Sequence, residues 1–118
     1  MNANMDTWDR SHLFPSHDGP NVLPNSPLFT KLLRHAHRGR AAIRDWNGQD
    51  VLKTYGDLLC DALALKATLE RKLGSDTCAR IRRGEGLYVG VLAAGGYQFA
   101  VAMVSVLALG AAVVPMCK

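Results

Sequence analysis

The sequence predicts an α/β fold in which a helix, a β-hairpin and a second helix precede one β–α–β unit. Three observations support this prediction. The stretch Gly86–Cys117 has no charged side chain but is interrupted by glycine and proline. Asn47-Gly48 separates two short segments with alternating apolar positions, and two further segments repeat apolar residues at helical spacing. This order is typical of a sheet that begins with a hairpin and continues with parallel strands.

The 118 residues divide into a leader, residues 1–25, and one domain, residues 26–118. The leader is rich in Asn, Asp and Pro and poor in aliphatic side chains, which predicts disorder. The first helix is expected to begin at Ser26-Pro27, an N-cap followed by proline, and to end at Gly39. Its apolar residues recur at helical spacing: Leu28, Phe29, Leu32, Leu33 and Ala36.

Asn47-Gly48 predicts the turn of a hairpin with strands Ala41–Trp46 and Val51–Lys53. Thr54 follows directly and is expected to cap the second helix through its hydroxyl. Asp57 lies in the first turn, where a negative charge meets the positive end of the helix, in a shortened version of a capping box.

The second helix is predicted to run to about Leu73, because Gly74 is a natural helix stop. One apolar stripe follows its length: Leu58, Leu59, Ala62, Leu65, Leu69 and Leu73. Residues 75–86 are polar and basic, and they are predicted to form a loop that leads into the first buried strand.

Two interpretations compete for the uncharged closing stretch. Its length alone is typical of a membrane span, here a helix over Phe99–Val114. The glycines and the proline instead favour a strand over Leu87–Ala93, a turn at Ala94–Gly96, a helix over Tyr97–Leu109 and a strand over Ala111–Val114. An apolar helix between two apolar strands is typical of a crossover unit in a parallel sheet, and this interpretation is favoured.

A net charge of +4 suggests an anionic partner, but the basic residues are scattered among acidic ones. The densest group, Arg80, Arg82 and Arg83, lies beside Glu85 and has no interleaved aromatic residues. A solvated loop therefore explains this group better than a phosphate-binding patch, and no nucleic-acid partner is expected.

The cysteine pattern and the chain ends indicate a cytoplasmic protein. The cysteines Cys60, Cys78 and Cys117 are odd in number and form no C-x-x-C motif, which argues against a disulfide framework or a zinc site. The first residues have no signal-peptide pattern, and Met116-Cys117-Lys118 is no peroxisomal signal.

Glycine motifs give no firm cofactor site. Gly84-Glu85-Gly86 with Gly90 misses the dinucleotide fingerprint in spacing, and these glycines precede a strand instead of following it. Gly95-Gly96 follows a strand and opens a helix, where backbone N–H groups can bind an anion. A tight turn explains this pair as well and is the favoured interpretation. No lysine follows a glycine, which excludes a Walker-type phosphate loop.

Polar candidates likewise have plain structural explanations. Asp57 and Asp61 are one helical turn apart, which is typical of a solvated helix edge more often than of paired catalytic carboxylates. Ser105 lies in an apolar helix and is expected to be a small packing residue. His35 and His37 point to different faces and are expected on the surface near a helix C-terminus. No catalytic, cofactor-binding or metal-binding residue is predicted.

The order of the segments resembles the N-terminal part of the acyl-adenylate-forming (AMP-binding) enzymes, and most closely acyl-CoA synthetases acting on short or malonate-like acids. The hairpin around Asn47-Gly48, with Ala41–Asp45 before it, and the segment Thr54–Leu59 resemble the family's opening hairpin and Thr-Tyr-x-x-Leu helix start. Residues 87–99 and Leu109–Met116 are similar to its next unit, which ends in a Gly-Ala-x-x-x-Pro strand.

The resemblance implies a partial subdomain of an adenylate-forming fold. A complete relative would activate a carboxylic acid with ATP and Mg²⁺ through an acyl-adenylate and transfer the acyl group to coenzyme A. The family's phosphate loop, its Tyr-Gly-x-Thr-Glu and Thr-Gly-Asp motifs and its catalytic lysine all lie beyond the part that this chain resembles. The matched residues Thr54, Gly95, Gly96, Gly110 and Pro115 are scaffold, and the chain alone is expected to bind no cofactor and to be catalytically incompetent.

Three alternatives remain at this point. One is a structural or interaction protein that docks on a full-length relative or on a missing C-terminal portion. Another is a small protein with a single membrane span, which the punctuated closing stretch makes less favoured, and the third is a nucleotide-binding module at Gly95-Gly96.

Overall fold

The computed structural model describes residues 23–24, 26–46, 49–93 and 95–116. Most of the predicted disordered leader, the Asn47-Gly48 turn, Ala94 and Cys117 therefore lie outside the described residues. Leu23, within the predicted leader, is fully buried in the hydrophobic core.

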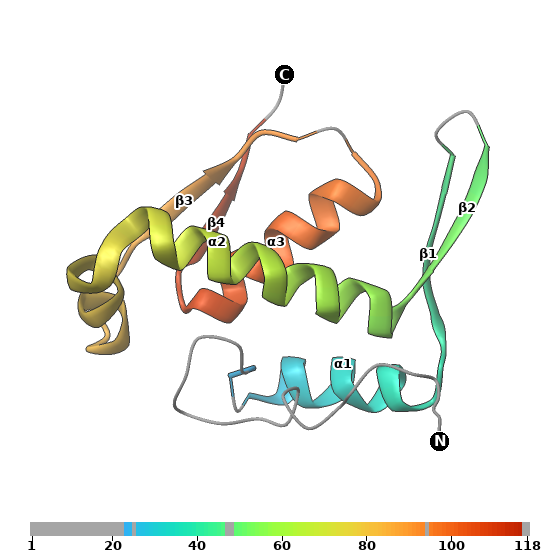
Figure 1. The fold of residues 1–118 in the computed structure, drawn as a ribbon, viewed down its shortest axis with the longest axis horizontal. Coiled ribbons are helices and arrows are strands. Elements are labelled where there is room, and N and C mark those ends of the chain that lie inside the picture. The colour runs from blue at the N-terminus through green and yellow to red at the C-terminus, as the bar shows by residue number, and fades with distance from the viewer. Residues whose placement is uncertain (1–22, 25, 47–48, 94, 117–118) are drawn as a thin grey trace.

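The fold is mixed α/β, with three helices and two separate two-stranded sheets (Figure 1). The predicted order of helix, hairpin, helix, strand, helix and strand is confirmed. The elements are α1 (Pro27–His37), β1 (Ala41–Trp46), β2 (Asp50–Thr54), α2 (Tyr55–Arg82), β3 (Tyr88–Val91), α3 (Tyr97–Leu109) and β4 (Ala112–Pro115).

Helix α1 begins as its sequence predicts. Ser26 is the N-cap, its Oγ accepts a hydrogen bond from the N–H of Phe29 at 3.5 Å, and proline occupies the first helical position. Phe29, Leu33 and Ala36 face the core, whereas Leu28 remains about half exposed.

The two sheets correct the prediction of one sheet that continues from the hairpin. Strands β1 and β2 pair antiparallel, with Arg44 opposite Leu52, and β3 pairs with β4 in parallel, with Tyr88 opposite Ala112. Strand β2 runs directly into α2, and the straight part of this helix before Gly74 is roughly 28 Å long at 1.5 Å per residue. The hairpin and the parallel pair consequently lie toward opposite ends of α2, too far apart to pair (Figure 1).

The region after Gly74 corrects a second prediction. Gly74 leaves helical geometry as expected, with φ 88° and ψ 160°, but the chain resumes a helix that lasts to Arg82. Residues 75–82 are therefore helical, and the loop is confined to the residues between Arg82 and Tyr88. The physical reason is burial: Cys78 and Ile81, three residues apart on one helical face, pack into the interior.

Helix α3 lies between the parallel strands as a crossover helix and spans Tyr97–Leu109, as predicted. Gly110 ends it in the left-handed conformation (φ 96°), and a Cβ there would lie 3.2 Å from Cγ2 of Ile81. Strands β3 and β4 are four residues each. Strand β3 begins one residue later and ends two residues earlier than the predicted Leu87–Ala93.

Two hydrophobic clusters hold these elements together. The larger joins α1, α2 and α3 around residues such as Phe29, Leu59 and Val104. The smaller joins α3 to the parallel strands around Val91 and Val106. Ser105 is fully buried, and its Oγ donates to the carbonyl of Ala102 at 2.8 Å, a backbone contact that fits the predicted packing role.

No helix within the described residues is both long and apolar enough to cross a bilayer.

Candidate functional site

Polar side chains from three elements meet at the N-terminal end of α3. They are Asp45 of β1, Lys53 of β2 and Asp61 of α2, arranged around Tyr97, the first residue of α3. The backbone N–H of Tyr97 donates to Asp45 Oδ2 at 3.0 Å. The Tyr97 hydroxyl donates to Asp61 Oδ2, and Lys53 Nζ lies 5.1 Å from the centroid of the Tyr97 ring. This group is called the α3 junction below.

The glycine turn that precedes α3 is occupied by a carboxylate of the chain itself. Gly96 is the helix N-cap and has φ 87°, and a Cβ on it would lie 2.7 Å from each carboxylate oxygen of Asp45. A negative charge at the positive end of a helix is stabilising. Asp45 thus occupies the position that an external phosphate would need. A tight turn was the favoured interpretation of Gly95-Gly96, and the carboxylate that fills it was not anticipated from the sequence.

Two groups at or beside the α3 junction, the Tyr97 phenol and the Cys60 thiol, have raised pKa values. Burial, the hydrogen bond to Asp61 and the negative charge of Asp61 together raise the pKa of the Tyr97 phenol well above its ordinary value. Burial, followed by the charges of Asp61 and Asp57, raises the pKa of the nearby Cys60 thiol. Because the thiolate is the nucleophilic form of cysteine, Cys60 is a poor nucleophile at neutral pH.

Asp57 and Asp61 make separate contacts in the structure. Asp57 Oδ2 accepts the N–H of Thr54 at 2.9 Å, and Thr54 Oγ1 accepts the N–H of Asp57 at 3.1 Å. Both bonds of a reciprocal capping box are present, so the predicted cap is complete despite its shorter carboxylate. Asp61 is instead engaged by Tyr97.

A second polar group, not anticipated from the sequence, lies at the kink of α2. Lys66 is only 5% exposed and lies 3.9 Å from Glu70 Oε2, measured from its Nζ. Burial lowers the pKa of Lys66, and the charge of Glu70 opposes this shift. Cys78 Sγ donates to the backbone carbonyl of Glu70 at 3.8 Å, a contact that joins the helix beyond the kink to the part before it. Lys66 follows Leu59, Ala62 and Leu63 at helical spacing, which was the available signal for its burial.

Several other basic and imidazole side chains make structural contacts. Arg80 and Arg83 pair with Glu85 at 3.0 and 3.1 Å on the surface, and these hydrogen bonds lower the pKa of Glu85. The half-buried His35 accepts a hydrogen bond from Arg40 at 3.0 Å and its ring centroid lies 5.0 Å from that of Tyr55. Among the described residues, no group of His, Cys, Asp or Glu side chains is placed to hold a metal ion.

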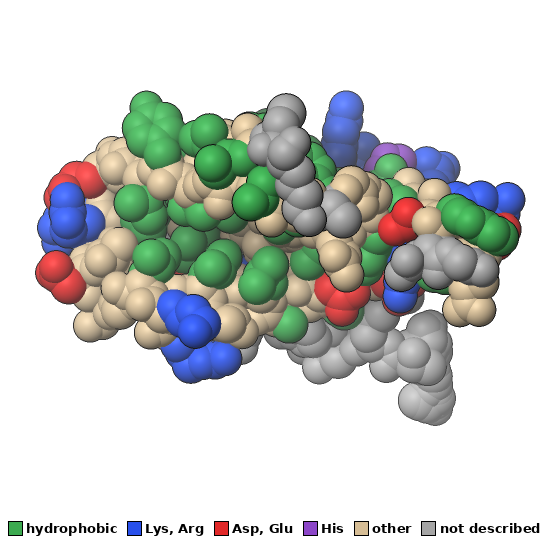
Figure 2. All heavy atoms as spheres, turned by 90° about the horizontal axis from the view of Figure 1, so that it is seen from above, with side chains coloured by type: hydrophobic (Ala, Val, Ile, Leu, Met, Phe, Trp, Pro, Cys, Tyr) green, Lys and Arg blue, Asp and Glu red, His purple; other side chains and the backbone are tan. Residues whose placement is uncertain are grey.

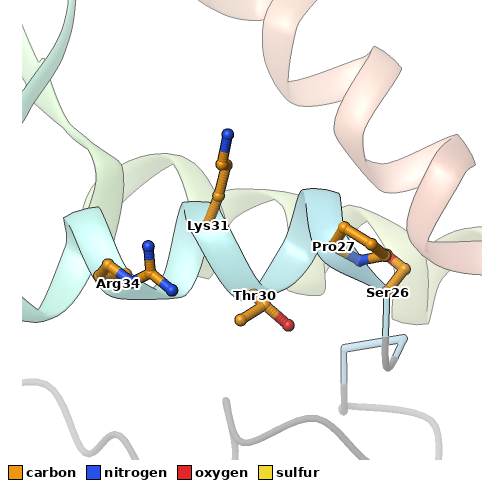
Figure 3. Close-up of a pocket in the computed structure, with 5 residues that line it drawn as sticks. All are labelled: Ser26, Pro27, Thr30, Lys31 and Arg34. Atoms are coloured by element: carbon orange, nitrogen blue, oxygen red, sulfur yellow. The ribbon is translucent and has the colours of Figure 1, made fainter.

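A shallow groove of about 370 Å³ runs along α1 and is lined by Ser26, Pro27, Thr30, Lys31 and Arg34. All five residues belong to α1 or its cap, and Figure 3 shows that Lys31 and Arg34 point in different directions. Two cations that do not converge lack the geometry that a phosphate or carboxylate site requires.

Comparison with protein-family models finds no match, and the comparisons with curated proteins and with solved structures also find none. The fold itself defines the class: a small α/β unit with a hairpin, a kinked helix and one parallel β–α–β crossover.

Proposed function

We propose that residues 27–116 form the N-terminal part of an acyl-adenylate-forming fold of the acyl-CoA synthetase type. One observation carries the proposal. The capped helix α2 follows the hairpin without a loop, and the β3–α3–β4 crossover then ends at Gly110 and a short strand that reaches Pro115. This order and these boundaries agree with the segments that resemble the family in sequence.

The role proposed for these residues is that of a scaffold. Thr54 caps α2, Gly96 admits the Asp45 carboxylate at the start of α3, and Gly110 ends α3 in a left-handed conformation. In a complete protein, ATP, Mg²⁺, a carboxylic acid and coenzyme A would be bound by motifs that these 118 residues do not contain. The chain by itself would then form no acyl-adenylate.

The proposal is tested by transplantation. Residues 27–116 would replace the corresponding N-terminal segment of a complete acyl-CoA synthetase, and ATP–pyrophosphate exchange would be measured. We expect the chimera to retain exchange activity, because the segment supplies packing and no reacting group. A chimera carrying Gly110→Val, which cannot adopt the left-handed helix end without strain, is the matched control and is expected to lose folded protein.

Two results would contradict the proposal. A chimera that folds cooperatively but shows no exchange with any acid of the parent enzyme would contradict the proposed family relationship. Exchange activity in the purified 118-residue chain would instead show that the segment is itself an enzyme.

A further inference from the structure

The parallel strands have one covered face and one open face. Val89 and Val91 of β3 and Val113 of β4 pack against α3, together with Phe99 and Ala102 of this helix. The alternate residues point to the other side, and every one of them is exposed. This open face consists of Tyr88, Gly90, Leu92, Ala112, Val114 and Met116.

We propose that the open face is the surface through which two copies of this chain associate, packing face to face about a two-fold axis. The proposal concerns the 118-residue chain itself and does not rest on the proposed function.

The composition of the strands is typical of a strand pair that is covered on both faces. Parallel strands that are covered on both sides read as continuous apolar runs, whereas strands with one solvated face alternate apolar and polar residues. Strands β3 and β4 read YVGV and AVVP, and the hydroxyl of Tyr88 is the one polar side-chain group in them. Tyr88 is nevertheless 78% exposed, Leu92 56% and Met116 53%.

The size of the open face fits a weak dimer. Its large side chains expose an apolar area on the order of 500 Å², near the upper end of the largest patches on monomeric proteins. Two such faces would bury on the order of 1,000 Å², which is the lower limit for a specific interface. An interface at this limit is expected to be weak, so the dimer should form only as the chain concentration rises.

The charge distribution favours a second copy as the occupant. Each copy carries a net charge of +4, but no residue from Leu87 to Met116 is charged. Figure 2 shows hydrophobic side chains gathered over the part of the molecule that carries β3 and β4, with charged side chains at the two ends and a basic group along one edge. Two uncharged faces can meet without bringing like charges together, and a two-fold interface needs a surface that complements itself.

The strand register makes the open face uneven, because large side chains lie beside small ones. Tyr88 lies beside Ala112, and Gly90 lies beside Val114, so large and small side chains alternate across the strand pair. A Cβ on Gly90 would be 2.7 Å from Met116 Sδ, so this methionine fills the hollow at Gly90. Methionine is flexible enough to move when a partner packs there. A two-fold axis that runs along the strands, between β3 and β4, would place the Tyr88 ring of each copy over Ala112 of the other.

The test is the mass of the purified chain by sedimentation equilibrium across micromolar concentrations. We expect a concentration-dependent rise from 12.8 kDa to twice this mass. Tyr88→Lys and Val114→Lys, both at exposed positions, should weaken dimerisation about tenfold or more, since each would place an unpaired ammonium in the apolar interface. Leu52→Lys, an equally drastic change at an exposed hairpin residue, is the matched control and should leave dimerisation unchanged.

Each other outcome overturns the proposal. A wild-type chain that stays monomeric at all concentrations would show that the open face is free or serves a different partner, such as a full-length relative. A dimer that is insensitive to both strand variants, with circular dichroism unchanged, would place the interface elsewhere. A dimer disrupted by Leu52→Lys alone would assign the interface to the hairpin.

Discussion

At the scale of single residues, the α3 junction shows how one side chain can join two distant segments. Asp45 and Tyr97 are 52 residues apart, and their hydrogen bond connects the hairpin to the start of α3. The bond requires a glycine at position 96, because any Cβ there would collide with the carboxylate. The neighbouring Gly95 has nothing within 4 Å of the position of its Cβ, so this glycine is not required by close packing.

The two glycines therefore predict opposite outcomes for the same substitution. Gly96→Ala should lower the free energy of unfolding by about 1–3 kcal/mol, because it combines a positive φ with a collision against Asp45. Gly95→Ala should change it by no more than about 0.5 kcal/mol. Urea unfolding of the two variants beside the wild type measures both values. Equal losses would mean that the Asp45 carboxylate does not occupy the helix end.

Tyr97 predicts an alkaline loss of stability. Its folded-state pKa is raised above the ordinary value of 10.0, so above that pH the folded chain binds more protons than the unfolded chain. The stability that this group contributes is thus fully present below pH 10 and declines as pH rises beyond it. Tyr97→Phe should flatten the decline in urea-unfolding free energy above pH 10.

A decline with the same slope in wild type and Tyr97→Phe would contradict this assignment. The raised pKa of Cys60 acts in the same direction from about pH 9 in both proteins, and the lowered pKa of Lys66 acts in the opposite direction in both. Lys66 therefore does not alter the comparison between wild type and Tyr97→Phe, whereas the charge of Cys60 is itself one of the smaller causes that raise the pKa of Tyr97.

At the scale of elements, the kink of α2 separates two helical segments that pack against different parts of the molecule. The part before Gly74 packs against α1 and α3, whereas the helical segment beyond it lies toward the end of the molecule that carries β3 and β4 (Figure 1). Cys78 and Ile81 of this segment are buried. Residues 75–82 are too few to form a stable helix alone, so tertiary packing holds them.

The kink determines whether a substitution of Gly74 raises or lowers the free energy of unfolding. In a continuous helix, Gly74→Ala would raise the unfolding free energy by about 1 kcal/mol, because alanine has the higher helix propensity. At φ 88° and ψ 160° an alanine is strained, so we expect a loss of about 1–3 kcal/mol instead. Thermal or urea unfolding gives the answer directly. A stabilised Gly74→Ala variant would indicate that α2 is straight.

At the scale of the whole molecule, stability is unevenly distributed. The helices share one buried core, whereas the hairpin has two residues, Trp46 and Leu52, that are 72% and 52% exposed. A two-stranded hairpin is only marginally stable by itself, and here the bond between Asp45 and α3 is one of its few ties to the core.

Amide hydrogen exchange should reflect this distribution. The amides of β1 and β2 are expected to exchange through local opening, with much less protection than those of α2 before Gly74 and of α3. Asp45→Asn should lower protection in the hairpin further while leaving that of α2 unchanged. Hairpin amides that are protected as strongly as those of α2 would contradict this hierarchy.

Local chemistry in the sequence was sufficient to predict the element order, the boundaries of α3, the Thr54 cap and the helix stop at Gly110. These features depend on residues within a few positions of one another, so composition and spacing determine them. The same is true of Gly74, whose departure from helical geometry needs only its own freedom of rotation.

Only the tertiary structure determined whether a helix follows Gly74, whether the two strand pairs join, and which polar groups lie together. Whether helix resumes after Gly74 depends on the burial of Cys78 and Ile81, and whether two strand pairs join depends on the length of α2 between them. Asp45, Asp61 and Tyr97 come together from three elements, with no local pattern that links them. Contacts between residues far apart in the chain are set by how whole elements pack, and periodicity within one segment carries no information about that.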